Sequence, residues 1–524
     1  MGRYHRLNEP PRWWNAAVTV PPTAFAVVFV ITPVAMLAVR AVSVEAVTAT
    51  LSDPRTWRVI WFTTFQAMIS TVATVAIGLV PGLVIARSSF RGRQFVLSLF
   101  AAVFVMPTVV MAAGVRALLP GDPTGLLPIV IAHTLFNLAI VIRGIAAAPV
   151  PVELEQAATV LGARPIEVAR TITLPLLRPT LVGLTAVVFA LCFTSFGVVR
   201  ILGSTSSTTL EVEIWRETII LGRIDRGVVL AVIQLVMLAV GIGVWIVIRR
   251  RTGAFHSGNR QPISRRGRYV VIVSCLLVSA PIIALIQGSF RVNGAVSASG
   301  WRNLLSNSIR PGLRLGFDPV DAMLVSFFTA TFATVFALML SVLIVAAVAS
   351  SPRFGRVVDG VAMLPLGISA VTLGLGLLIT FDVPPFDWRA SPLMTPLGHA
   401  LIATPFVVRP VVGALATMNR QQVDAAATLG ARPIRSLADS IIPIVTVPLL
   451  SGAGFAIAIS LGEFGATSML SRSGGETLPI VIERLLARTG GDFRARAYGL
   501  SLILASATMG IVIALETAAN RKQR

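Results

Sequence analysis

The chain has 524 residues, of which 55% are hydrophobic and only 13% are charged. An average soluble domain contains about 25% charged residues, so this composition excludes an ordinary water-soluble fold. Apolar stretches recur along the chain with the roughly 20-residue length that a helix needs to cross a ~30 Å hydrocarbon core. Because they are too long for the strands of a membrane barrel, we expect an all-α integral membrane protein.

The formal net charge of +21 does not indicate a nucleic-acid-binding protein. The basic residues lie in short loops between apolar stretches instead of forming one patch, a pattern that orients membrane proteins in the lipid bilayer. The two cysteines, Cys192 and Cys275, both fall in apolar stretches. They therefore indicate neither a disulfide framework nor a cysteine metal site.

The first apolar stretch, 24–42, follows Arg3, Arg6 and Arg12. It is longer than the core of a signal peptide and lacks a clear small-residue cleavage motif, so we interpret it as a retained span. Apolar length and Pro/Gly-rich or charged breaks predict about twelve spans in all. In chain order they lie near residues 24–42, 59–86, 95–118, 126–148, 180–203, 227–249, 269–290, 320–349, 356–380, 396–418, 449–471 and 497–517.

A segment rich in Gly, Ser, Pro and Arg separates the sixth span from the seventh. It predicts a first half at 1–250, a cytoplasmic linker at 251–268 and a second half at 269–524, each half with six spans. The loops that are cytoplasmic when the N-terminus is inside carry more Lys and Arg, although Arg484 and Arg488 go against the trend. Both termini are therefore expected in the cytoplasm.

The two halves repeat one another at an offset of about 268 residues. The clearest match aligns Gln156-Ala157-Ala158-Thr159-Val160-Leu161-Gly162-Ala163-Arg164-Pro165-Ile166 with Asp424-Ala425-Ala426-Ala427-Thr428-Leu429-Gly430-Ala431-Arg432-Pro433-Ile434. Similar shifts relate Ser195-Phe196-Gly197 to Glu463-Phe464-Gly465, Pro175 to Pro443, and His133 to His399. Because six spans, an even number, separate equivalent points, the halves form a parallel repeat about an axis along the membrane normal.

The repeated segments lie between the fourth and fifth spans of each half and are too long for simple turns. A helix-compatible stretch from Val152 to Leu161 ends at Gly162, which can adopt the positive φ of a helix terminus. Pro165 can open a second short helix. The second copy has the same punctuation at Gly430 and Pro433, so each half is predicted to carry a protruding helix–turn–helix.

These segments resemble the cytoplasmic loop of the permeases of type I ABC importers, which has a Glu-Ala-Ala start, a glycine six residues after the acid and a later Leu-Pro. The matching positions are Gln156, Ala157, Ala158 and Gly162, and then Asp424, Ala425, Ala426 and Gly430. The acid is Gln in the first copy, beside Glu155, and is shortened to Asp in the second. The resemblance implies that both loops couple the chain to ATPase subunits.

A further resemblance, to the fused two-half permeases of thiamine and ferric-iron importers, covers most of both halves. It is carried by Phe193-Thr194-Ser195-Phe196-Gly197 with Thr208-Thr209-Leu210-Glu211-Val212-Glu213-Ile214-Trp215, and by Ser460-Leu461-Gly462-Glu463-Phe464-Gly465 with Thr477-Leu478-Pro479. The thiamine-type pattern is slightly closer. Permeases for phosphonates, polyamines and other anions share related motifs, so the transported solute stays open.

The resemblance implies a permease in a bacterial inner membrane that works with an extracytoplasmic solute-binding protein and a homodimer of ABC ATPase subunits. A P-loop requires Lys followed by Ser or Thr, whereas the single lysine is Lys522. ATP hydrolysis is therefore expected on separate chains. We predict no enzymatic activity and no cofactor for this one.

Among polar residues in the spans, Glu463 and its repeat counterpart Ser195 are candidates for the translocation path, because an acid in a span is costly unless it is paired or hydrated. Glu463 also fits a broken helix near the interface, where its carboxyl is hydrogen-bonded locally. His133 and His399 are too few for a metal site, so we interpret them as interfacial residues with satisfied hydrogen bonds and predict no metal.

Two other functions would require different sequence features. An ion-gradient-driven secondary transporter would carry acidic residues in several spans and no repeated cytoplasmic helix pair. A membrane-embedded enzyme would require a catalytic motif, and the sequence contains no HExxH and no nucleophile elbow. The repeated helix pairs favour the importer permease.

Overall fold

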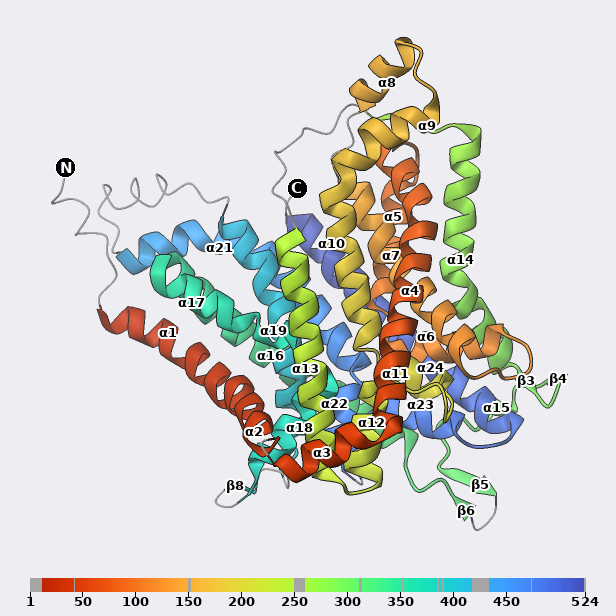
Figure 1. Ribbon diagram of the computed structural model, residues 1–524, viewed down its shortest axis with the longest axis vertical. Helices are drawn as coiled ribbons and strands as arrows, with labels where there is room; N and C mark the ends of the chain where they lie inside the picture. Colours follow the sequence, from red (N-terminus) through yellow and green to blue (C-terminus); the bar gives the residue numbers. More distant parts are fainter. Residues whose placement is uncertain are drawn as a thin grey trace.

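The computed structural model describes residues 12–41, 43–148, 152–248, 260–310, 313–350, 352–383, 386–387, 391–416, 433–472 and 474–522. Long helices run roughly parallel through the molecule, and short helices and two-stranded hairpins lie at its ends (Figure 1). This arrangement confirms the predicted all-α membrane fold.

The helices that precede the linker belong to the first half. They are α1 (Arg12–Ala26), η2 (Val27–Ile31), α2 (Thr32–Arg40), α3 (Val44–Ser52), α4 (Pro54–Arg87), α5 (Arg93–Val105), α6 (Thr108–Leu118), α7 (Leu126–Ala147), α8 (Val152–Val160), α9 (Pro165–Val168), η3 (Ala169–Thr173), α10 (Leu174–Phe193), α11 (Gly197–Leu202), α12 (Leu210–Trp215), η4 (Arg216–Ile220) and α13 (Ile224–Ile248).

The second half begins, in the structure, with a helix that starts within the predicted linker. Its helices are α14 (Arg265–Ser289), α15 (Ser299–Arg302), α16 (Pro319–Ser350), α17 (Pro352–Ala362), η5 (Leu364–Gly367), α18 (Ala370–Phe381), α19 (Met394–Leu415), α21 (Pro433–Gly462), α22 (Gly465–Leu470), α23 (Leu478–Leu486) and α24 (Gly491–Lys522).

In the described parts of the chain, the strands are two or three residues long and form four two-stranded ladders. β1 (Ser88–Ser89) pairs in parallel with β2 (Gln261–Pro262), which ties the end of α4 to the start of α14. The other ladders are antiparallel: β3 (Arg291–Val292) with β4 (Ala295–Val296), β5 (Ser308–Arg310) with β6 (Leu313–Arg314), and β7 (Asp382–Val383) with β8 (Phe386–Asp387).

In the described residues, 10 helical segments are long and apolar enough to cross a membrane, and one bent pair raises the number to 11. The bent pair is α5 with α6, which meet at 100°. The remaining predicted span, 356–380, corresponds to α17, η5 and α18, of which α18 is a shorter apolar helix. The span predicted at 95–118 is therefore two helices joined at a bend, and the span predicted at 356–380 is α17 and α18 joined through the short helix η5.

Two other predicted spans are also interrupted. The span predicted at 180–203 is divided between α10 and α11, and the one at 449–471 is divided between α21 and α22. Irregular backbone inside a membrane is tolerated where protein buries it. Phe196 and Phe464 at these two breaks are only 5% and 4% exposed, so the breaks lie in the protein interior.

Small residues allow α4 and α7 to pack closely. A Cβ atom added to Gly78 would lie 2.7 Å from Cγ1 of Val141, and one added to Gly82 would lie 2.8 Å from Cβ of Ile145. Glycines four residues apart form the small-xxx-small pattern by which membrane helices approach. The hydroxyls of Thr71 and other residues of α4 donate to carbonyls one turn earlier, which satisfies them without water.

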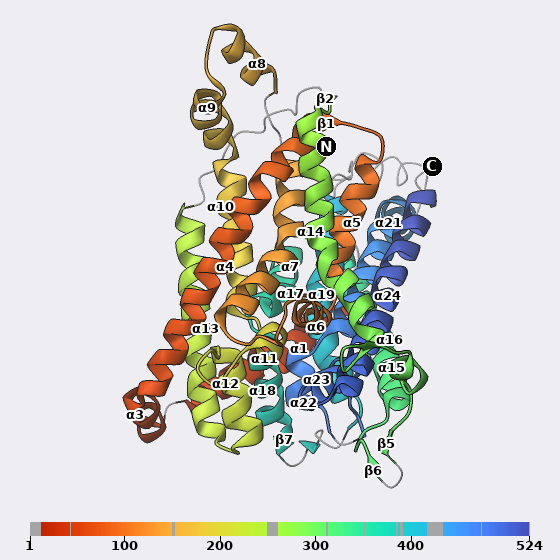
Figure 2. The ribbon, with the colours of Figure 1, turned by 90° about the vertical axis from the view of Figure 1, so that its right-hand side faces the viewer.

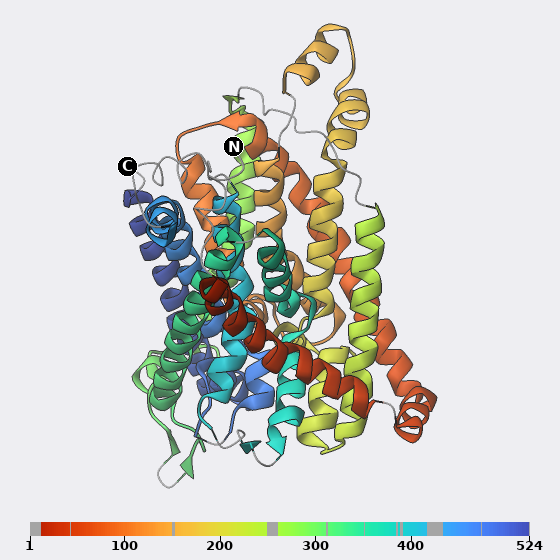
Figure 3. The ribbon, with the colours of Figure 1, turned by 90° about the vertical axis from the view of Figure 1, so that its left-hand side faces the viewer.

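The first span of each half packs against the opposite half. α1 contacts α16 and α17, and α2 contacts α18. Conversely, α14 contacts α4 and α6 of the first half. Figure 1 and Figure 3 show α1 running across α16 and α17 at the edge of the molecule. This exchange joins the two halves into one body.

The molecule has two distinct ends (Figure 2). At one end, called here the α8 end, lie α8, α9, β1, β2 and the start of α14. At the other, the α12 end, lie α3, α12, α23 and the β5–β6 hairpin. The helix pair predicted at 152–166 and the loop predicted at 204–226 are therefore on opposite ends.

Candidate functional site

The helix pair α8–α9 protrudes from the bundle (Figure 1) and has the predicted turn. Gly162 has φ +91°, as expected for a residue that ends a helix. Its N–H donates to the carbonyl of Thr159 at 3.0 Å, and the N–H of Ala163 donates to that of Ala158 at 3.0 Å. These two bonds form a Schellman motif, in which glycine is favoured because it has no Cβ. Pro165 then begins α9, as predicted.

The tip of this pair presents apolar side chains to the exterior. Val160 and Leu161 are each 87% exposed, and Ile166 is 59% exposed. Large apolar side chains exposed together on a protruding segment are typical of surfaces that bind a partner.

Glu155 fastens the base of the pair to the membrane helices. Its Oε1 accepts a hydrogen bond from Arg87 at the end of α4 at 2.6 Å and another from the hydroxyl of Thr173 in η3. Gln156 and Ala157 are exposed, and Ala158 is half-buried. The side chain that anchors the pair is therefore Glu155, which directly precedes Gln156, the position at which the resembling permeases have a glutamate.

The second predicted loop, with Asp424, Ala425, Ala426 and Gly430, lies outside the described residues. Pro433, the counterpart of Pro165, begins α21.

The breaks of the two fifth spans meet between the halves. The rings of the repeat-related residues Phe196 and Phe464 are 5.1 Å apart. A Cβ atom on Gly197 would lie 3.3 Å from Phe464, and one on Gly462 would lie 3.1 Å from Pro107 at the α5–α6 bend. Three helix breaks therefore converge at the interface of the halves.

Glu463 lies in the break between α21 and α22, where its Oε1 accepts a hydrogen bond from the N–H of Ala466 at 2.9 Å. Glu463 is thus hydrogen-bonded locally at a broken helix, which is one of the two roles that the sequence suggests for it. Ser195, its counterpart, is buried, and its carbonyl accepts from Thr209 at 3.5 Å. Both candidates lie beside the paired Phe196 and Phe464 at the half–half interface.

A second acid near this interface was missed from the sequence. Glu211 of α12 is 1% exposed and accepts a hydrogen bond from Nε2 of Gln234 at 2.5 Å. The Glu211 carboxyl also lies within hydrogen-bonding reach of Ser369 in α18 and within electrostatic range of the Glu463 carboxyl. Glu211 falls between the spans predicted at 180–203 and 227–249, so nothing in the sequence placed it in the interior.

Polar contacts between the halves close the α12 end. Arg200 of α11 forms an ion pair with Glu483 of α23 at 2.8 Å and lies 4.3 Å from the ring of Trp215. Arg116 of α6 donates to the carbonyl of Leu486 at 3.1 Å. The same guanidinium, hydrogen-bonded to Asp122, holds the pKa of that carboxyl below its usual range.

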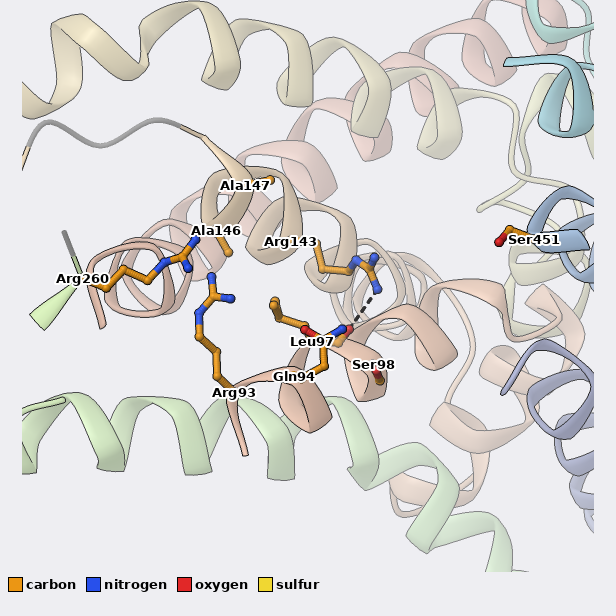
Figure 4. Close-up of a pocket in the computed structure, with 9 residues that line it drawn as sticks. All are labelled: Arg93, Gln94, Leu97, Ser98, Arg143, Ala146, Ala147, Arg260 and Ser451. Atoms are coloured by element: carbon orange, nitrogen blue, oxygen red, sulfur yellow. Dashed lines mark hydrogen bonds between the residues drawn. The ribbon is translucent and has the colours of Figure 1, made fainter. Parts of the chain in front are cut away.

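The α8 end has a cavity of about 420 Å³ between α5 and α7 of the first half and α21 of the second (Figure 4). The two halves are therefore in side-chain contact at the α12 end, whereas a cavity lies between α5, α7 and α21 at the α8 end.

The two repeat-related histidines, His133 of α7 and His399 of α19, are both buried in the protein. His399 is bonded through Nδ1 to Ser460 at 2.8 Å and through Nε2 to Thr467 at 2.7 Å. His133 lies 3.4 Å from the hydroxyl of Ser70. In the described part of the chain, no group of three or more His, Cys, Asp or Glu residues is arranged to hold a metal ion.

Comparison with known proteins assigns the family. The sequence model of the family described as 'binding-protein-dependent transport system inner membrane component' matches residues 75–251 and again residues 337–520. Two matches in the same order agree with the internal repeat, and the second covers α19, α21, α22 and α23.

Full-length relatives share the two-half organisation. The chain is 28% identical over 510 residues to the thiamine transport system permease protein ThiP of Brucella suis, covering 90% of this chain and 89% of the relative. It is 24% identical over 490 residues to ThiP of Escherichia coli K12, covering 86% of each chain. The putative 2-aminoethylphosphonate transport system permease protein PhnU of Salmonella typhimurium is 26% identical over 226 residues, which are 40% of this chain and 77% of PhnU.

The repeated family match, the permease relatives and the membrane helices agree on a transport protein, not an enzyme. The chain belongs to the family of inner membrane components of binding-protein-dependent transport systems and is a permease subunit of an ABC importer.

Proposed function

We propose that this permease imports thiamine or a closely related small solute. The supporting observation is the similarity to ThiP, which extends over 90% of this chain and through both halves. PhnU matches a shorter part of the chain, so a phosphonate is the second candidate. Ferric iron rests on the sequence motifs alone.

The α8–α9 pair is proposed to dock on one subunit of an ABC ATPase homodimer, and the segment around Asp424 to Gly430 on the other. The exposed apolar tip at Val160 and Leu161 supports the first contact. The ion pair between Glu155 and Arg87 supports transmission, because it ties the docking helix to a membrane span. Cysteines at Ala158 and Ala426 should each crosslink to the ATPase. Failure of both, in an assembled complex, would remove this assignment.

The α8 end is proposed to be cytoplasmic, with both termini and the segment 251–268 on that side. The positive-inside bias supports this orientation. Arg93 and Arg260 line the cavity at the α8 end. The segment 204–223, which contains α12, lies at the α12 end, where the binding protein would dock (Figure 2). Reporter fusions at 255 and 205 should report the cytoplasm and the exterior respectively; the reverse result would invert the scheme.

Transport itself is tested in proteoliposomes that contain the chain, its ATPase and its binding protein. Labelled thiamine should accumulate only when ATP and the binding protein are both present. Accumulation driven by an ion gradient without the ATPase would favour the secondary transporter instead. Uptake of 2-aminoethylphosphonate but not thiamine would keep the importer and replace the solute.

A further inference from the structure

His399 of α19 joins the two sides of a helix break. Its Nδ1 is bonded to the hydroxyl of Ser460 at 2.8 Å, and its Nε2 is bonded to the hydroxyl of Thr467 at 2.7 Å. Ser460 lies in α21, before the break, and Thr467 lies in α22, after it. All three side chains are buried, and hydrogen bonds are stronger in such surroundings than in water. This set of three residues, called here the His399 bridge, ties both helix ends to a neighbouring span.

The donors in the His399 bridge follow from the number of protons. The Thr467 hydroxyl donates its single proton to the carbonyl of Glu463 at 3.1 Å. Nε2 of His399 therefore donates to Thr467, and in a neutral imidazole Nδ1 then accepts from the hydroxyl of Ser460. A chain of hydrogen bonds thus runs from α19 through Thr467 to the backbone of the break itself.

The break that the His399 bridge spans carries a contact between the two halves. Oε1 of Glu463 accepts from the N–H of Ala466 at 2.9 Å, which folds this side chain back onto the start of α22. The next residue, Phe464, places its ring 5.1 Å from that of Phe196 in the other half. Because the bridge bonds lie on both sides of Phe464 in the chain, they fix the direction in which its ring points.

The first half has the histidine but not the bridge. At the repeat offset, Ser460 and Thr467 correspond to Cys192 and Val199. α7 contacts α10 and α11, just as α19 contacts α21 and α22. In the described part of the chain, however, the ring of His133 has one hydrogen-bond partner, a hydroxyl of α4 at 3.4 Å, and its Nε2 has none. Helix packing around the break therefore does not by itself require the bridge.

We propose that His399 is a positioning residue for transport, which holds the α21–α22 break in the shape that brings Phe464 against the first half. Loss of a bridge bond leaves its buried partner unsatisfied and loosens the break. ATP hydrolysis then continues while less solute crosses, because the contact between the halves no longer follows the movement of α19. The proposal rests on the chain being an importer permease and not on the identity of its solute.

The test uses the complete complex in proteoliposomes, with the ATPase and the binding protein. Thr467→Val and Ser460→Ala each remove one bridge bond, and His399→Gln removes the ring. Ser468→Ala is the matched control, because this neighbouring hydroxyl donates to a carbonyl of its own helix. His133→Gln is the repeat-related control. Uptake of labelled thiamine per ATP hydrolysed is measured together with membrane abundance.

The bridge variants and the controls should separate clearly. Uptake per ATP should fall roughly fivefold or more in Thr467→Val and His399→Gln, as for the loss of a buried hydrogen bond, and stay near the wild-type value in both controls. Equal ratios in the wild type and Thr467→Val overturn the proposal. Loss of the bridge variants from the membrane, with normal controls, also overturns it in favour of a folding role. If the wild type takes up no thiamine, the solute assignment fails, and the ratio is measured with 2-aminoethylphosphonate.

A spectroscopic readout tests the bridge without any solute. In protein that carries nitrogen-15-labelled histidine and is held in lipid, solid-state NMR should show a protonated Nε2 and an acceptor Nδ1 for the ring that is lost in His399→Gln. Thr467→Val should shift its Nε2 resonance, whereas Ser468→Ala should not. Identical Nε2 resonances in the wild type and Thr467→Val would remove the bond to Thr467, and the proposal with it.

Discussion

Replacing Gly162 with valine tests whether the turn of the α8–α9 pair is required for coupling. The substitution acts only through the backbone, because a Cβ atom at this position meets nothing within 4 Å. Valine is therefore not expected to clash. It is expected to reject φ +91°, because left-handed backbone brings Cβ too close to the following carbonyl.

The magnitude follows from that conformation. Left-handed backbone costs an L-residue about 1–2 kcal/mol, and β-branched residues tolerate it least. A change of that size alters the ratio of formed to unformed turn by roughly 5- to 30-fold. The hydrogen bonds from Gly162 to Thr159 and from Ala163 to Ala158 would be lost together. The spans stay intact, because the turn protrudes from the bundle (Figure 1).

The assay measures ATP-dependent uptake and membrane abundance for a series at this position. Asparagine is the matched control, because it adopts left-handed backbone more readily than valine and also adds a side chain. Uptake should fall in the order Gly, Asn, Ala, Val, and valine should lose roughly 5- to 30-fold if docking requires the formed turn. Abundance should stay near normal throughout. Equal uptake by the glycine and valine proteins would refute the reasoning, whereas loss of the valine protein from the membrane would show that the turn is needed for folding.

Three further changes probe other contacts. Gly82→Leu should lower the thermal unfolding midpoint, because overpacking costs about 1–3 kcal/mol, whereas Gly241→Leu should not, since nothing lies within 4 Å of a Cβ there. Glu155→Gln should reduce uptake with little change in abundance, because it breaks the ion pair with Arg87; unchanged uptake would remove its anchoring role. Arg200→Gln should loosen the α12 end, as measured by distances between spin labels on the two halves.

The sequence predicted the features that depend on composition and local turn chemistry. Apolar length located the spans, and the glycine and proline punctuation located α8, Gly162 and α9. These succeed because burial in lipid and positive φ are each set by residue type at one place in the chain. The repeat also predicted two equivalent family domains, which the two matches confirm.

What the sequence could not supply depends on contacts across long separations. Apolar length does not distinguish a straight span from the 100° bend between α5 and α6, because both halves of a bend are apolar. Glu211 looked like a loop acid because its short helix follows a polar segment, and only the fold places Gln234 beside it. The cavity at the α8 end likewise depends on α5, α7 and α21, which are far apart in the sequence.

The Arg200–Glu483 pair shows how the two halves use repeat-related positions differently. At the offset of about 268 residues, Glu483 corresponds to Trp215, and Arg200 contacts both, as an ion pair at 2.8 Å and a cation–π contact at 4.3 Å. Arg200 thus contacts Trp215 in its own half and Glu483, the repeat-equivalent residue, in the other half. Its partner carboxylate is 12% exposed, so the bridge is partly shielded from water and its loss costs more than a surface pair. Because the ion pair with Glu483 joins the two halves, Arg200→Gln should shift the population toward separation at the α12 end.

Labels at Thr205 and Thr489, one on each half, should then show a longer or broader distance distribution, in a background where Cys192 and Cys275 are replaced. Arg223→Gln is the control, because Arg223 pairs with Glu217 of its own half at 3.7 Å and does not bridge the halves. Glu483→Gln should reproduce the effect of Arg200→Gln, and the double variant should add less than the sum of the two, as for residues that share one contact. Identical distributions for the wild type and Arg200→Gln would mean that the apolar contact of Phe196 with Phe464 keeps the end closed without the ion pair.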